Sequence, residues 1–267
     1  MVSLPVFRAE AAQLTGAVGA TVRLAGAEAR HAATVRRMAP GELLELVDGD
    51  GLRVTAQVVR AAADELELTV TRTEREPARV PELILVQALA KGDRDLQAVE
   101  SCTELGVDAV VPWQADRSIA RLRPERRSKQ LAKWESALVA AAKQSRRARW
   151  PRLQEPVSSA SLARRIAAEP DTRWLVLHET ATDRLVELAP ALGASSTPGG
   201  SAAEPAGHGR VSSVAVIVGP EGGVAERELE RFLEAGAHPV LLGPEVLRSS
   251  TAGAAAITVL CAALGRW

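Results

Sequence analysis

Two glycine-punctuated loops in the last fifth of the chain carry residues suited to binding a small ligand. One is 219-GPEGG-223, and the other lies within 241-LLGPEVLRSSTAG-253. Each follows a short apolar run, at Val214–Val218 and Val240–Leu242, which predicts two buried strands with both loops at the carboxyl edge of one sheet. Because glycine lacks a Cβ and tolerates positive φ, these loops can bring backbone amides into direct contact with a ligand.

The loop residues restrict the class of ligand. The GPEGG loop has no G-x-x-x-x-G-K-S/T pattern and no lysine nearby, and Glu221 would oppose a phosphate, so the pattern argues against a P-loop. Backbone amides and carbonyls can read an adenine edge while a carboxylate faces a cation, which favours S-adenosylmethionine (SAM). The alternative is a tight strand-to-helix turn that binds nothing.

The distribution of charge points to a polyanion as partner. The 267-residue chain has a formal net charge of zero, yet residues 115–152 contain twelve Lys/Arg against three Asp/Glu. The alternative is a solvated helix face in an arginine-rich chain, which has 29 arginines and four lysines. At 46% hydrophobic residues, the chain is long enough to bury a large core.

Neither export nor a metal site is indicated. Cys102 and Cys261 are far apart and form no C-x-x-C, so we expect two buried thiols, no disulfide and no metal. The first residues lack a basic segment followed by a long apolar one, and the most apolar stretch, Ala254–Leu264, is too short to span a bilayer. A cytoplasmic protein that does not enter membranes is the expectation.

A change of period divides the chain into two predicted domains. Residues 1–73 alternate in short β-like runs around one helical stretch, roughly Gly26 to Met38, as in a small β-barrel-like domain. Residues 74–267 alternate buried strands and helices, as in an α/β domain, with a flexible insert at about 190–210 rich in Pro, Gly, Ala and Ser. The predicted strands are Thr21–Leu24, Leu43–Val47, Arg53–Val59, Leu66–Thr71, Leu83–Leu89, Ala109–Pro112, Trp174–His178, Val214–Gly219 and Pro239–Leu242.

An ordered series of short motifs resembles one known family. GPEGG followed by an acidic helix and then by LLGPEVLRSSTA resembles the RsmE-type 16S rRNA uridine-N3 methyltransferases of the SPOUT superfamily. Matches in the same order cover nearly the whole chain, including Lys91-Gly92-Asp93, Thr103-Glu104-Leu105-Gly106, Asp116-Arg117-Ser118 and His178-Glu179. In the first domain, His31, Arg36, Pro40-Gly41 and Asp48-Gly49-Asp50-Gly51 resemble its PUA-like RNA-binding barrel.

The resemblance implies a fold, a cofactor and partners. The fold would be a SPOUT-type α/β methyltransferase domain tied in a trefoil knot and preceded by a small PUA-like β-barrel domain. Two subunits would pair at the knot as a homodimer, and the substrate would be 16S rRNA in the 30S ribosomal subunit. SAM would contact three loops, which here comprise Leu177, His178, Glu179, Val218, Gly219, Pro220, Glu221, Gly222, Gly223, Leu241, Leu242, Gly243, Val246, Leu247, Arg248, Ser249, Ser250, Thr251 and Ala252.

Some positions depart from the family pattern. Related chains read L-R-T-E-T-A where this one reads Leu247-Arg248-Ser249-Ser250-Thr251-Ala252, so a carboxylate is missing at Ser250. Lys143 and Arg146 replace the usual acid and glycine of an A-A-E-Q-S-G-R segment, which adds positive charge.

The reaction assigns roles to a few side chains. Methylation at uridine N3 requires the imide proton to leave, so a general base or a cation that stabilises the developing anion would serve. Arg248 is the candidate cation, Glu221 is the candidate base and Glu179 is a second candidate base. The alternatives are that Arg248 has a purely structural role and that His178 is simply packed at the end of a strand. Candidate phosphate contacts are Arg36, Arg37, Arg117, Arg121, Arg146 and Arg147. Two other readings stay open: a knotted methyltransferase for a different RNA nucleotide, and a catalytically silent RNA-binding or ribosome-assembly protein.

Overall fold

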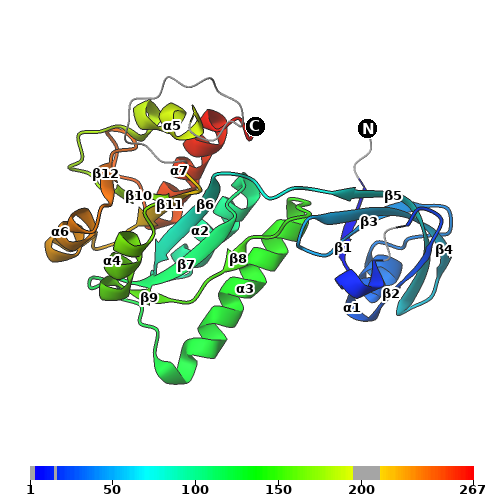
Figure 1. Ribbon diagram of the computed structural model, residues 1–267. Coiled ribbons are helices and arrows are strands. Elements are labelled where there is room, and N and C mark those ends of the chain that lie inside the picture. The colour runs from blue at the N-terminus through cyan, green and yellow to red at the C-terminus, as the bar shows by residue number, and fades with distance from the viewer. Residues whose placement is uncertain (1–3, 15–16, 195–210) are drawn as a thin grey trace. The chain divides into compact units, whose positions relative to one another are not determined.

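The computed structural model describes residues 4–14, 17–194 and 211–267, which form two compact units (Figure 1). The N-terminal unit comprises Met1–Ala78 with Ala142–Trp150, and the C-terminal unit comprises Arg79–Ala141 with Pro151–Trp267. The predicted boundary between residues 73 and 74 lies inside a strand that continues to Arg75. Nothing in the sequence indicated that residues 142–150 pack with the N-terminal unit.

The N-terminal unit is built on a five-stranded sheet in the order β1-β3-β4-β5-β2. β1 pairs with β3 in parallel and the other pairs are antiparallel. Alternate residues enter the core; in β2, for example, Val22 and Leu24 are buried between exposed neighbours. The four predicted strands are confirmed, while β1 was not predicted. The elements are β1 (Val6–Arg8), the 3-10 turn η1 (Ala11–Gln13), β2 (Thr21–Ala25), α1 (Gly26–Arg30), the π-helical turn η2 (His31–Val35), β3 (Leu43–Val47), β4 (Leu52–Ala61) and β5 (Glu65–Arg75).

The C-terminal unit is an α/β fold on a seven-stranded sheet. Its order is β12-β10-β11-β6-β7-β8, with β9 also paired to β7, and every pair is parallel. The sequence predicted the other five strands, but not β8 and β9, which have two residues each. The strands are β6 (Glu82–Ala88), β7 (Ala109–Gln114), β8 (Arg152–Leu153), β9 (Val157–Ser158), β10 (Thr172–Leu177), β11 (Ser213–Val218) and β12 (His238–Val240).

Helices cover both faces of this sheet (Figure 1). Residues of α2, α3, α5 and α7 share one apolar cluster with Leu83, Leu85 and Val216. Residues of α4 and α6 share the cluster on the opposite face with Ile84 and Val86. The helices are α2 (Arg94–Leu105), α3 (Arg127–Gln144), α4 (Ser159–Ala168), α5 (Leu185–Ala194), α6 (Glu226–Glu234) and α7 (Ser249–Ala263), with a 3-10 turn η3 (Pro124–Arg126) before α3.

The helical end of α5 corrects one prediction. Residues 190–194 were expected to begin a flexible insert, but they belong to α5. Leu185, Ala189 and Leu192 are buried at helical spacing, and this apolar stripe outweighs the loop-like composition. The remainder of the predicted insert, residues 195–210, lies outside the described residues.

The two cysteines are free and buried, as the sequence predicted. Burial raises the pKa of the Cys102 thiol to about 12, with a smaller contribution from Cys261. A thiol in this state is not nucleophilic at neutral pH. We expect Cys102 to resist iodoacetamide at pH 8 in the native chain and to react in denaturant, as mass spectrometry of its peptide would report; rapid native labelling would contradict its burial.

None of the helices in the described residues is long and apolar enough to cross a membrane.

Candidate active site

The three predicted ligand loops meet at one edge of the C-terminal sheet. β10 lies between β12 and β11, with Leu177 opposite Val240 and Val176 opposite Ile217. Because all three strands run in the same direction, the loops that follow them leave the same edge. The predicted placement of both glycine loops at the carboxyl edge of one sheet is confirmed.

Backbone hydrogen bonds join the loop after β10 to the loop after β12. The Leu241 amide donates to the Asp183 carbonyl at 2.8 Å, and the Leu185 amide donates to the Leu241 carbonyl at 2.9 Å. At the imidazole of His178, Nδ1 accepts from the Thr180 amide at 3.3 Å, while Glu179 is exposed. These contacts fix the first of the three loops and leave the Glu179 carboxylate on the surface.

The GPEGG loop needs glycine for internal reasons at two positions. A Cβ on Gly219 would lie 2.9 Å from Cγ2 of Val224, and Gly223 has a φ of +72°. The Gly223 amide closes the turn by donating to the Pro220 carbonyl at 2.9 Å. Tight turning alone therefore accounts for these two glycines, whereas it does not account for Gly222, whose φ is not positive.

Glu221 ties the GPEGG loop to the loop after β6. Its Oε1 accepts from the Lys91 amide and from Nη1 of Arg94, each at 3.1 Å. The carboxylate is about one-fifth exposed. A general base needs a free lone pair facing the proton that it removes, so these bonds leave only Oε2 for that role.

Two of the predicted RNA contacts lie at this edge. Arg117, in the loop after β7, donates from Nη1 to the Gly222 carbonyl at 3.2 Å, and a Cβ on Gly222 would lie 3.2 Å from Cβ of Arg117. Arg121 donates from Nη2 to the Asp116 carbonyl at 2.9 Å. Both guanidiniums thus hydrogen-bond to loop carbonyls at this edge, and both residues are exposed.

A buried carboxylate connects three segments of this edge, a role that the sequence did not reveal. Glu228, in the first turn of α6, is 1% exposed. Its Oε1 accepts from the Asp116 amide at 2.8 Å and from the Ser159 hydroxyl, and its Oε2 accepts from the Ala225 amide at 3.0 Å. The Trp113 indole in turn donates to Ser159 Oγ at 3.1 Å. Its position three residues after the N-cap Ala225 was the available signal, because a glutamate there reaches back to the N-cap amide.

Removing this carboxylate is expected to destabilise the C-terminal unit. Glu228→Ala leaves one buried and two partly buried donors without an acceptor, which costs about 3 kcal/mol of unfolding free energy. Glu226→Ala, on the same helical turn but exposed, is expected to cost less than about 1 kcal/mol. Denaturant unfolding of both variants measures the difference, and equal losses would rule out the assigned role of the Glu228 network.

The N-terminus of α7 completes the edge. Ser249 and Ser250, which open the helix, are 7% and 6% exposed. Arg248 precedes them as N-cap and is exposed, and its guanidinium bonds to no residue in the described part of the chain. The Thr251 amide donates to the Arg248 carbonyl at 2.8 Å, whereas the Ser249 and Ser250 amides have no acceptor among the described residues. First-turn amides carry partial positive charge, so this end favours an electronegative ligand group.

Three buried side-chain oxygens at this edge lack a hydrogen-bond partner among the residues described: Gln87 Oε1, Ser118 Oγ and Ser249 Oγ. Gln87 is the penultimate residue of β6 and lies opposite Val218, Ser118 follows β7, and Ser249 begins α7. Leaving such atoms unsatisfied costs about 1–3 kcal/mol each. A ligand with amine, hydroxyl and heterocyclic nitrogen groups would satisfy them, so the residues present fit a nucleoside-containing cofactor such as SAM.

Two family models and several relatives match most of this chain. The RNA methyltransferase domain matches residues 76–261 and the RNA methyltransferase PUA domain matches residues 24–71. Ribosomal RNA small subunit methyltransferase E of Mycobacterium tuberculosis is 39% identical over 251 residues, which are 93% of this chain and 89% of that protein. The Bacillus subtilis protein of the same name is 28% identical over 90% of this chain and 89% of its own length.

Solved structures agree with the sequence matches. Ribosomal RNA small subunit methyltransferase E from Neisseria gonorrhoeae, bound to SAM, has a TM-score of 0.74 and 27% identity over 97% of this chain and 98% of its own. A Legionella pneumophila methyltransferase in complex with SAM has a TM-score of 0.78 and 27% identity over 98% of each chain. The fold and the two matched domains thus define an RNA methyltransferase that carries a PUA domain and belongs to the SPOUT class. Within that class, the chain belongs to the ribosomal RNA small subunit methyltransferase E family.

Proposed function

We propose that this protein transfers a methyl group from SAM to N3 of a uridine in 16S rRNA of the small ribosomal subunit. The observation that carries the proposal is the edge where three loops meet the N-terminus of α7. It combines buried oxygens at Gln87, Ser118 and Ser249 with the Arg248 guanidinium, none of which has a hydrogen-bond partner among the described residues. The relatives that bind SAM or act on small-subunit rRNA support both halves of the reaction.

The cofactor would occupy the loops after β10, β11 and β12. There Gly222 and Gly243 present backbone without a covering Cβ, and the Ser249 and Ser250 amides in the first turn of α7 have no acceptor among the described residues. When bound, SAM supplies an electrophilic methyl group on a sulfonium. We retain all nineteen predicted contact residues of these loops as the proposed cofactor site.

The chain's own residues must deal with the N3 proton. As that proton leaves, negative charge spreads over N3 and the two uracil carbonyl oxygens, and N3 then forms the new bond to carbon while the sulfur–carbon bond breaks. A guanidinium at Arg248 stays cationic and offers several donors to those oxygens. Oε2 of Glu221 and the exposed Glu179 are the proposed acceptors of the proton, which passes from them to solvent.

The remaining predictions are part of the same proposal. They comprise a homodimer at the trefoil knot, a cytoplasmic location, association with the 30S subunit, and a division into domains near residue 74. A uridine inside folded RNA must be unstacked before it can enter such an edge, so shape rather than charge would select it.

One experiment tests the proposal directly. The purified protein is incubated with radiolabelled SAM and with 30S subunits that lack the modification, and the RNA is then digested to nucleosides for mass analysis. Label in 3-methyluridine is the expected result. Label in another nucleoside would instead support a knotted methyltransferase of different specificity, and SAM binding without any label would support a catalytically silent RNA-binding protein.

A further inference from the structure

Two exposed arginines occupy backbone conformations that favour glycine. Among the described residues, the non-glycine residues with positive φ are Arg37 at +52°, Asp93 at +56° and Arg146 at +58°. Aspartate tolerates this region because its short polar side chain bonds locally, whereas arginine has no such compensation. Both arginines belong to the N-terminal unit.

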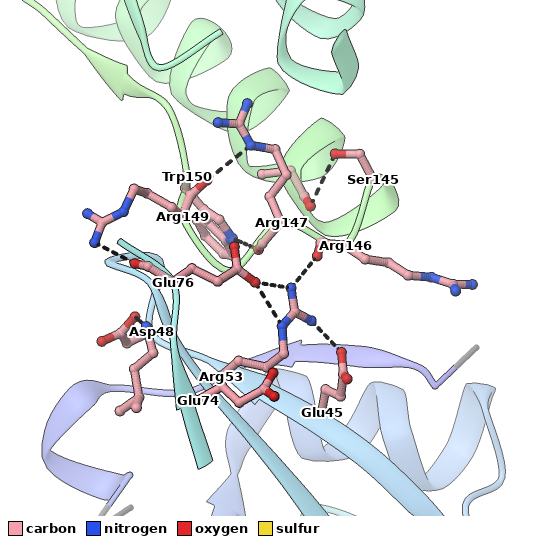
Figure 2. Close-up of polar contacts among 12 residues, drawn as sticks. Glu45, Asp48, Arg53, Glu74, Glu76, Ser145, Arg146, Arg147, Arg149 and Trp150 are labelled. Carbon is pink, nitrogen blue, oxygen red and sulfur yellow. Dashed lines mark hydrogen bonds and ion pairs between the residues drawn. The ribbon is translucent and has the colours of Figure 1, made fainter. Parts of the chain in front are cut away.

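The backbone of Arg146 is held in place by a second arginine (Figure 2). Nη2 of Arg53 donates to the Arg146 carbonyl at 2.8 Å, and the Arg146 amide donates to the Lys143 carbonyl at 3.1 Å. Arg53 is itself fixed by ion pairs to Glu45 and Glu76 and is 15% exposed. Burial opposes its charge, but the two carboxylates outweigh burial, so the pKa of the Arg53 guanidinium is raised.

The side chain of Arg146 is the exception among the cations of the segment 142–150. Lys143 pairs with Glu28 at 2.6 Å, Arg149 pairs with Asp50 at 2.6 Å, and Nε of Arg147 donates to the Arg149 carbonyl at 3.0 Å. These contacts pack the segment against the rest of the N-terminal unit. In Figure 2 the guanidinium of Arg146 points away from the cluster around Arg53. It is exposed and makes no bond to any residue within the described ranges.

Arg37 repeats the arrangement at the end of a helical turn. The Met38 amide donates to the Ala32 carbonyl at 3.0 Å, which places Arg37 at the position after η2 where glycine usually closes a helix. Arg37 is exposed, and its guanidinium likewise finds no partner in the structure as described.

We propose that Arg146 and Arg37 are phosphate contacts for the RNA substrate and that Arg53 positions Arg146. A left-handed arginine costs stability that glycine would restore, and neither side chain makes a compensating hydrogen bond or ion pair with the described residues of its unit. The compensating interaction therefore lies outside the chain, and a guanidinium that projects into solvent from a fixed backbone suits a phosphate oxygen pair. This inference rests on the proposed function, because the phosphates are those of 16S rRNA.

The test exploits opposite effects on stability and binding. In the full chain, Arg146→Gly and Arg37→Gly are each expected to raise the unfolding midpoint by about 2–5 °C, since glycine relieves the strain. Each is also expected to weaken binding to a 16S rRNA transcript about threefold to tenfold, and to reduce the slope of log K against log salt by about 0.7–0.9. Arg23→Ala, which removes a surface charge whose side chain is 74% exposed, is expected to change neither quantity.

Arg53 is tested by its dependence on Arg146. Arg53→Gln is expected to weaken RNA binding in the wild-type background and to have no further effect on binding in the Arg146→Gly background. A purely structural Arg53 would lower the unfolding midpoint equally in both backgrounds without this dependence in RNA affinity.

Two results would overturn the inference. If both glycine variants bind RNA with wild-type affinity and an unchanged salt slope, Arg146 and Arg37 are not phosphate contacts. The proposed methylation reaction would be unaffected by that result. If Arg23→Ala loses as much RNA affinity as the two glycine variants, general charge attraction explains the binding and specific phosphate contacts do not. If the wild-type chain itself bound no 16S rRNA, the proposed function would fall together with this inference.

Discussion

Replacing Arg248 by alanine is expected to lower kcat for methylation by about 100-fold or more while leaving the fold unchanged. Removing one preorganised donor from a developing anion typically costs about 100- to 1000-fold in kcat. The guanidinium is exposed and bonds to none of the residues described, so its loss breaks no internal contact. Single-turnover methylation of 30S subunits lacking the modification measures the rate.

Two further variants identify the role of Arg248. Arg248→Lys keeps the charge but loses the planar fork, so a rate between those of wild type and Arg248→Ala is expected. Arg227→Ala removes an exposed arginine of α6, outside the proposed site, and is expected to leave the rate unchanged. If Arg248→Ala leaves kcat normal and raises KM for RNA, Arg248 contacts a phosphate and does not stabilise the developing anion.

Valine at position 222 is expected to weaken SAM binding about tenfold to 100-fold. A Cβ there would already lie 3.2 Å from Cβ and 3.5 Å from the carbonyl oxygen of Arg117, and valine adds two more carbons. Overpacking of this kind costs about 1–3 kcal/mol, which corresponds to the stated loss if the GPEGG loop is displaced in the cofactor complex. Calorimetric titration with SAM measures the affinity.

A graded series separates the steric effect from the hydrogen bond. Gly222→Ala is expected to fall between wild type and Gly222→Val, because one carbon demands a shift of only a few tenths of an ångström. Arg117→Ala keeps the Cβ contact and removes the bond to the Gly222 carbonyl, and so reports that bond alone. Unchanged SAM affinity in Gly222→Val, with an unchanged unfolding midpoint, would place the cofactor away from this loop.

The sequence was most informative where a local pattern repeats. Alternation in β2 and the apolar run of β11 located these strands to within one or two residues. The order of apolar and polar side chains along a strand reports which of its faces are buried. Gly106 ends α2 with a φ of +109°, a left-handed conformation for which glycine is the usual residue at a helix end. Composition misled at residues 190–194, where small residues that are common in loops also fit a helix packed by Leu185, Ala189 and Leu192.

The candidate site divides in the same way. The sequence by itself determined the two glycine loops, their common edge of the sheet, Arg248 beside them as a candidate cation, and the family resemblance. Only the tertiary structure decided that Glu221 is tied to the loop after β6, that Glu228 joins three segments, and that Arg53 holds Arg146. Those contacts link residues 69 to 130 positions apart in the chain. Local periodicity reports which face of an element is buried, but it carries no information about which distant atom a side chain will meet there.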